Sequence, residues 1–213
     1  MDAYWKLRLE NCREALEKNN FQAFVAEDPD HARDIFFEQV LSGLMVKTVS
    51  WGDSMTLYAT GILDHFRQNP DFDLIETFDD RVSREKIVAR RRRALLADLF
   101  FTGSNAVTES GCLVNLDMIG NRVAGLTFGP RTAVVTVGRN KIVSDLETAM
   151  QRIKDRAAPM NAMRHASRTP CAKTAVCMDC RSPQRICNVW SIIEKAFPAG
   201  RIKVILINKD LGL

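Results

Sequence analysis

Short apolar segments alternate with longer amphipathic segments along most of the chain, and this alternation limits the fold more than any other feature. The short segments are rich in apolar residues and are bounded by turn residues, as strands are: residues 21–27, 45–52, 71–77 and 201–208. The longer segments place apolar residues at helical spacing: residues 3–19, 28–44, 55–66 and 83–100. The alternation predicts an α/β domain with a mostly parallel sheet flanked by helices.

The middle of the chain differs in composition from both ends. It is rich in Gly, Asn and β-branched residues, a pattern that predicts three short strands joined by tight turns, over 112–117, 123–128 and 132–137. A helix is expected over 145–158 and another over 189–197. Because a chain of 213 residues without an evident linker or repeat is of ordinary domain size, we expect one domain over residues 1–213.

Charge and hydropathy exclude several classes of partner. The net charge of +4 is mild, and the four arginines at 90–93 point all around the expected helix, so we expect no nucleic-acid partner. The charged segment 1–18 lacks the apolar core of a secretory signal, and no apolar run is long enough to cross a bilayer. We therefore expect a cytoplasmic protein with no membrane partner.

Polar residues gather in the turns of the middle segment. In α/β sheets, ligands collect where strands end, and Gly-rich turns offer backbone N–H groups to anions. The candidate ligand-binding residues are Thr102, Gly103, Ser104, Asn105, Thr108, Arg122, Gly138, Asn140 and Lys141. They predict a site for a small anionic metabolite, although turn stabilisation alone also explains several of the Gly and Asn residues.

Glu109 is the candidate catalytic residue. It lies in the turn Glu109-Ser110-Gly111, where a carboxylate can act as an acid, a base or a nucleophile. The alternative is that Glu109 only caps the turn, and its spacing favours neither role over the other.

Four of the six cysteines fall within residues 171–187, at Cys171, Cys177, Cys180 and Cys187. Four thiolates in one short stretch can hold zinc or an iron–sulfur cluster, and the central C-x2-C pair has a common metal-ligand spacing. The flanking spacings are irregular, and buried packing of free thiols is the alternative. We assign the isolated Cys12 and Cys112 to packing.

An ordered series of motifs resembles the LUD domain, the domain of the lactate-utilisation proteins LutB and LutC. The motifs are TGSNAVTESGCLVNLDMIGNRVAGLTFGP, VGRNKIV, AAPMNAMRH, TPC, CMDC, RICN and GRIKVILINKDLGL. The match is strong over 80–213 and weak over 1–80. It implies a fold similar to ribose-5-phosphate isomerase and CoA-transferases, and a part in oxidising lactate to pyruvate within an iron–sulfur-linked system of redox partner subunits. The resemblance also favours an iron–sulfur cluster over zinc as the metal centre at the four cysteines.

Two other functional classes stay open at this point. One is a stand-alone isomerase, hydrolase or acyl- or CoA-transferring enzyme that uses Glu109; the turn 109–111 is similar to the Glu-Asn-Gly that some CoA-transferases carry. The other is a metal or iron–sulfur interaction module whose cysteine loop docks onto a redox partner. The chain has no ferredoxin-like cysteine motif like those that LutB-type proteins carry beyond the LUD domain.

Overall fold

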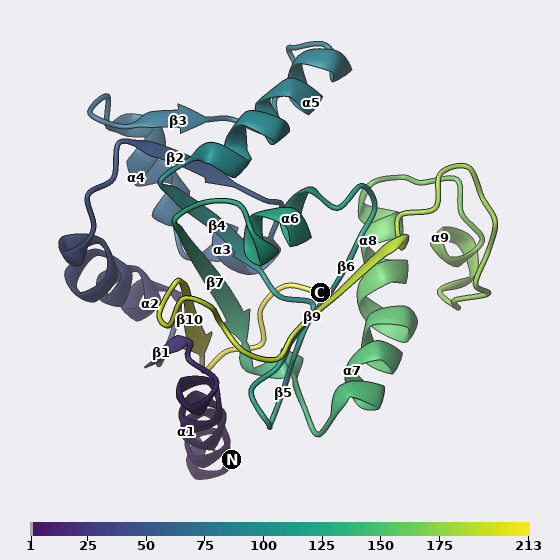
Figure 1. Ribbon diagram of the computed structural model, residues 1–213. Helices are drawn as coiled ribbons and strands as arrows, with labels where there is room; N and C mark the ends of the chain where they lie inside the picture. The colour runs from purple at the N-terminus through teal and green to yellow at the C-terminus, as the bar shows by residue number, and fades with distance from the viewer. Residues whose placement is uncertain (1) are drawn as a thin grey trace.

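The computed structural model describes residues 2–213, and its strands form two sheets (Figure 1). The larger sheet has six strands, and every neighbouring pair in it is parallel. In spatial order the strands are β1 (Gln22–Ala26), β10 (Ile202–Ile207), β7 (Thr132–Gly138), β4 (Leu99–Gly103), β2 (Thr48–Trp51) and β3 (Asp73–Ile75). The predicted α/β class with a mostly parallel sheet is therefore confirmed.

Helices connect the parallel strands and cover both faces of this sheet. They are α1 (Asp2–Lys18), α2 (Pro29–Ile35) with its extensions η1 (Phe36–Val40) and η2 (Leu41–Gly43), α3 (Met55–Ala59), α4 (Ile62–Gln68), α5 (Arg84–Arg93) with η3 (Ala94–Leu96), and α6 (Asn121–Thr127). One face of the sheet packs on α1 and α6, and the other packs on α2, α3 and α4.

The central strand β7 shows why the sheet is buried on both sides. Val135 packs in the cluster under α1, whereas Val134 packs in the cluster under α2 and α4. Side chains alternate between the two faces of a strand, and both faces are apolar here, so β7 reads as a continuous apolar run. Such a strand fits only the interior of a sheet that helices cover on both sides.

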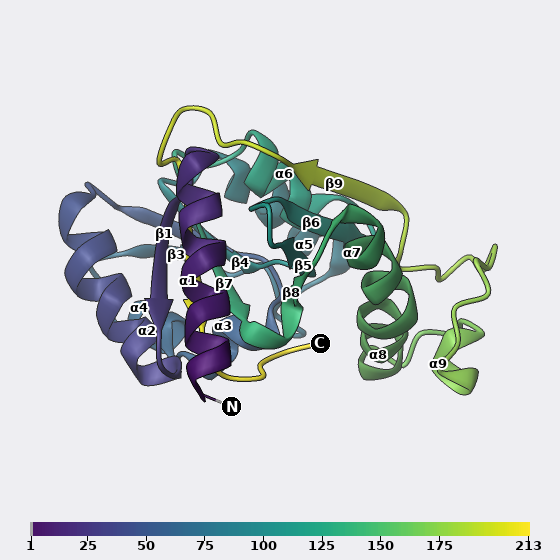
Figure 2. The ribbon, with the colours of Figure 1, turned by 90° about the horizontal axis from the view of Figure 1, so that it is seen from below.

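The smaller sheet stands beside the carboxyl edge of the larger one. Its order is β8 (Ile142–Val143), β5 (Ala106–Thr108), β6 (Leu113–Asp117) and β9 (Val189–Ile193). A long helical arm covers it, formed by α7 (Leu146–Arg152), η5 (Ile153–Ala157) and α8 (Ala158–Arg164). The short helix α9 (Cys171–Thr174) and the loop after it lie beyond α8, away from the larger sheet (Figures 1 and 2).

Two predictions of secondary structure are wrong: one expected strand is a helix, and one expected helix begins as a strand. Residues 123–127 lie in helix α6, with Phe128 as its C-cap, and not in a strand. Asp117 accepts hydrogen bonds from the backbone N–H groups of Arg122 and Val123 and so starts the helix. Gly125 there allows the helix to approach the ring of Phe100, which a Cβ would overlap. Residues 189–197 begin with strand β9 and not with a helix, because their alternating side chains pair with β6.

The expected helix over 83–100 ends earlier than predicted. Helical structure stops at Leu96, and Leu99 already belongs to the buried strand β4. The remaining short connection, η4 (Arg139–Lys141), follows β7. No helix within residues 2–213 is long and apolar enough to cross a membrane.

Candidate functional site

A cavity of about 610 Å³ lies at the carboxyl edge of the parallel sheet. Polar residues that follow three neighbouring strands line it: Asp53 and Ser54 after β2, residues 103–105 at the end of β4, and Lys141 after β7. Helices α5, α6 and α8 and part of the loop after α9 supply the other walls. Carboxyl ends of parallel strands meet at one edge, which is where α/β proteins collect ligands. Its volume is that of an ordinary small-molecule site.

Ser54 and Gly103 bring two of these strand ends into contact. The Ser54 hydroxyl starts helix α3 by accepting a hydrogen bond from the backbone N–H of Leu57 at 3.2 Å. A Cβ on Gly103 would overlap this hydroxyl. Glycine at 103 therefore lets the β2–α3 turn close against β4 and form the floor of the cavity.

Lys141 is a buried cation in the cavity wall. Only 5% of the residue is exposed, and its Nζ donates a hydrogen bond to Thr56 Oγ1 at 3.0 Å. Across residues 2–213, no carboxylate forms an ion pair with this lysine. Burial, together with the nearby charges of Arg152 and Arg122, lowers the pKa of Lys141 to about 7. A bound anion in the cavity would therefore provide the negative charge that Lys141 does not receive from a carboxylate of the protein.

Arg122, by contrast, is held by the protein itself. Its Nη2 lies 2.5 Å from Asp117 Oδ1 and donates to Asn105 Oδ1 at 3.0 Å. Both members of the ion pair are largely buried. Asn105 also accepts from the backbone N–H of Leu116 at 2.9 Å, so it links β6 to the end of β4. Arg122 therefore shapes the cavity wall with most of its donors already used.

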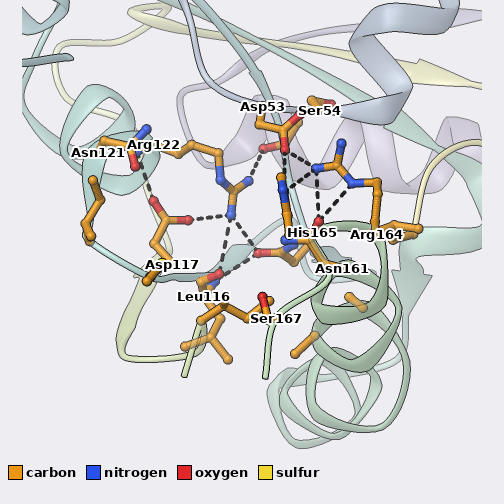
Figure 3. Close-up of a pocket in the computed structure, with 18 of the residues that line it drawn as sticks. Asp53, Ser54, Leu116, Asp117, Asn121, Arg122, Asn161, Arg164, His165 and Ser167 are labelled. Carbon is orange, nitrogen blue, oxygen red and sulfur yellow. Dashed lines mark hydrogen bonds and ion pairs between the residues drawn. The ribbon is translucent and has the colours of Figure 1, made fainter. Parts of the chain in front are cut away.

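Asp53 is the centre of a second polar cluster in the cavity, formed with Arg164 and His165, as Figure 3 shows. Its carboxylate accepts hydrogen bonds from Tyr58 at 2.9 Å and from Arg164, and its Oδ2 lies 3.2 Å from His165 Nε2. Burial raises the pKa of Asp53, but hydrogen bonds from His165 and Arg164 outweigh it and hold that pKa well below the ordinary range. Asp53 is therefore an ionised group that orients the His165 imidazole, an arrangement that suits proton transfer.

The cavity carries an excess of positive charge. Five lysine or arginine residues line it against two aspartates: Arg84, Arg91, Arg122, Lys141 and Arg164 against Asp53 and Asp117. Arg91 reaches the wall from α5, with its guanidinium carbon 4.6 Å from the centre of the Phe78 ring. Burial lowers the pKa of Arg91. This balance favours an anionic ligand.

Comparison with known families agrees with this architecture. The model of the LUD domain matches residues 9–207. The chain belongs to the LUD domain family. The resemblance seen in the sequence motifs is thereby confirmed. At family level, this LUD domain is associated with lactate-utilisation proteins.

Among solved structures, this LUD domain is similar to a DUF162 family protein from Deinococcus radiodurans. The two share 12% sequence identity, with a TM-score of 0.49 over 97% of this chain and 98% of that chain. Among curated proteins, none matches the chain.

The structure brings five of the nine predicted ligand-binding residues of this LUD domain to the cavity: Gly103, Ser104, Asn105, Arg122 and Lys141. The other four do not line it, and three of them serve local structure. Thr108 closes the β5–β6 turn through its hydroxyl, which accepts a hydrogen bond from the N–H of Cys112 at 2.9 Å. Gly138 and Asn140 instead hold the segment around Leu211, whose N–H donates to Asn140 Oδ1 at 3.1 Å. Thr102 is buried in β4.

Glu109 lies outside the cavity lining, at the turn between β5 and β6. Its half-exposed carboxylate pairs with Arg8 of helix α1 at 2.9 Å. The turn runs away from the carboxyl edge because β5 leaves that edge and Glu109 follows its far end. The position of Glu109 therefore gives no support to a reactive carboxylate, and it agrees with a structural contact between α1 and the turn.

The four clustered cysteines are free and partly buried, and they lie outside the main cavity. In the part of the chain that the structure describes, no three His, Cys, Asp or Glu side chains stand together in a metal-binding arrangement. Cys12, a residue of α1, is buried in the core between this helix and the larger sheet, in agreement with the packing role expected for it.

Sequence reasoning missed the cluster of Asp53, Arg164 and His165. A usable signal was present in Asp53-Ser54, a polar pair directly after an expected strand, to which the strand-end rule applies. Arg164 and His165 end the motif AAPMNAMRH of the family resemblance, but no strand-end rule assigned them to a site, because they reach the cavity from the end of the helical arm.

Proposed function

We propose that this LUD domain binds a small carboxylate metabolite, of the 2-hydroxy or 2-oxo acid class, and so serves lactate utilisation. The observation that carries the proposal is Lys141, a buried cation in the cavity wall that has no carboxylate partner among residues 2–213. The association of the family with lactate-utilisation proteins supports the chemical class of the ligand.

Lys141 suits this role better than the neighbouring arginines. Arg122 is already paired with Asp117, and Arg152 donates to the backbone oxygens of Asn105 and Asn140 at 2.7 Å and 3.1 Å. An ammonium group has three N–H donors, and Lys141 spends one on Thr56. The remaining donors are free for a carboxylate, and a charge-assisted hydrogen bond of this kind contributes about 1.5–3 kcal/mol.

The Asp53–His165 pair supplies a second function in the proposal. A hydroxyl or keto group beside the carboxylate of the ligand would face a polar cluster that can accept or donate a proton. Oxidation of lactate to pyruvate also removes hydride from the carbinol carbon, and an acceptor has to take up those electrons. We assign that step to redox partner subunits.

Isothermal titration calorimetry with L-lactate and pyruvate tests the proposal. Lactamide, which is neutral and of the same shape as lactate, serves as the ligand control. Lys141→Met should weaken binding of both acids at least about tenfold, since about 1.4 kcal/mol is lost for each factor of ten. Lys203→Met is the matched control, because Lys203 is also partly buried with a pKa lowered by burial but does not line the cavity. Equal affinity for lactate and lactamide would contradict the proposal.

A further inference from the structure

One small void of about 10 Å³ is lined by all four clustered cysteines, Cys171, Cys177, Cys180 and Cys187, and by the start of α8. All four are free thiols, and all four are partly buried. The void is separate from the main cavity, yet Ala158 and Ile186 line both. Four thiols that are spread over 17 residues of an irregular segment thus line a single void beside the ligand cavity.

The segment is held in this shape by Arg185. Its guanidinium donates to the backbone oxygen of Cys180 at 2.7 Å and to that of Cys187 at 2.9 Å. Its Nη2 also pairs with Asp179 at 2.8 Å, and Lys154 of the helical arm pairs with the same carboxylate at 3.1 Å. One arginine therefore clamps two of the cysteines together and ties their loop to η5.

Two residues with left-handed backbone turn the chain back toward the void. Ala175, with φ of 59°, ends helix α9 just before Cys177. Asp179, with φ of 44°, lies between Cys177 and Cys180. Such conformations are uncommon for residues other than glycine. Here they fall on either side of Cys177, in the segment that brings the C-x2-C pair to the void.

We propose that these four cysteines form a four-thiolate site for a thiophilic metal centre, either a single zinc ion or an iron–sulfur cluster. Tetrahedral coordination by four sulfurs is typical of both. The charge of the segment suits thiolates: Arg168, Lys173, Arg181 and Arg185 stand against one acidic residue, Asp179. A divalent ion with four thiolate ligands carries a net negative charge, which these cations would balance.

Metal binding would draw the thiols closer together than they lie in the chain alone. Zinc–sulfur bonds of about 2.3 Å place tetrahedral ligands about 3.8 Å apart, and no three of the described side chains stand in such an arrangement. Residues 175–187 contain no helix or strand, so the thiols can close on an ion without breaking a regular element. Because Ile186 also lines the main cavity, the same closure would order one cavity wall.

Metal content of the full-length chain, purified without oxygen and without chelators, tests this site. We expect about one zinc per chain, or iron with inorganic sulfide and broad visible absorption, as the four ligands imply. Either result supports the four-thiolate site and identifies its occupant. Cys177→Ser and Cys180→Ser should each lower the metal content at least about fivefold. Cys112→Ser is the matched control, because Cys112 is also partly buried but lies in the β5–β6 turn.

A second measurement needs no variant and separates loss of metal from loss of folding. Mass spectrometry after brief alkylation should find the four loop thiols protected in the purified protein and labelled after a chelator is added. Fewer than about 0.2 metal atoms per chain, against the one site that four ligands imply, would overturn the proposal. So would alkylation that is the same with and without the chelator. Neither readout depends on the ligand of the main cavity, so failure here leaves the proposed function standing.

Discussion

Oδ2 of Asp53 lies 3.2 Å from Nε2 of His165, although 112 positions of sequence separate the two residues. Asp53 follows strand β2 of the larger sheet, whereas His165 ends the helical arm that covers the smaller sheet. The contact joins the larger sheet to the helical arm, and both residues line the cavity. Its loss should therefore affect both the stability of the domain and the shape of the site.

Replacement of Asp53 by Asn should lower the free energy of unfolding by about 1–3 kcal/mol at pH 7, because charge-assisted hydrogen bonds from Arg164 and His165 are weakened. The folded-state pKa of Asp53 lies below its ordinary value, so its stabilising effect is present above that value and is lost as the pH falls toward the folded-state pKa. Urea unfolding at pH 7 and at pH 3 checks this. If the difference in free energy of unfolding between wild type and variant is as large at pH 3 as at pH 7, this prediction is contradicted.

Lys141→Met should raise the melting temperature near pH 7, by about 2–4 °C for each kcal/mol gained. The folded-state pKa of Lys141 is about 7 against the ordinary 10.5, so the unfolded chain binds more protons between these values. Stability of the wild type then rises with pH across this window. Differential scanning calorimetry should show a difference in melting temperature between variant and wild type that is smaller at pH 10 than at pH 7. A variant that melts lower at both pH values would show that Lys141 stabilises the fold.

Glu109→Gln should change the free energy of unfolding by less than about 1 kcal/mol, since the carboxylate forms a half-exposed ion pair with Arg8. Binding of lactate should be unchanged, because Glu109 does not line the cavity. Thermal melting and calorimetric titration measure the two effects separately. Loss of activity with normal folding and normal lactate binding would instead support the role of Glu109 as a reactive carboxylate.

Gly103→Ala should destabilise the domain by about 1–3 kcal/mol, because the new Cβ would overlap the Ser54 hydroxyl at the floor of the cavity. Gly43→Ala is the control, since a Cβ there has open space around it. Chemical unfolding of both variants checks the prediction. Equal stability of the two would mean that the β2–α3 turn moves freely away from β4.

The sequence predicted the larger sheet well where burial determined the pattern. Strand β7, buried on both faces, reads as an apolar run that only a strand in a covered sheet explains. The predictions for helix α6 and strand β9 were wrong because partners outside each segment determine its structure. Asp117 starts the helix, and β6 provides the edge with which β9 pairs. Local propensity cannot report such partners.

The site divides in the same way. Lys141 and residues 103–105 follow strands and were predicted from the rule that ligands gather at strand ends. Glu109 was grouped with them because it is close in sequence, but β5 carries it away from the carboxyl edge. Arg164 and His165 reach the cavity only because the helical arm folds back over it, which no local pattern reveals.

The dissociation constant of L-lactate between pH 6 and pH 9.5 tests the central role of Lys141 most directly. Lactate stays ionised over this range, so the affinity follows the protonation of the protein. With a folded-state pKa of about 7 for Lys141, affinity should be constant below pH 6.5. It should then fall about tenfold for each pH unit above 7.5, and Lys141→Met should remove this dependence. An affinity that is independent of pH in the wild type, or unchanged in the variant, would contradict the account.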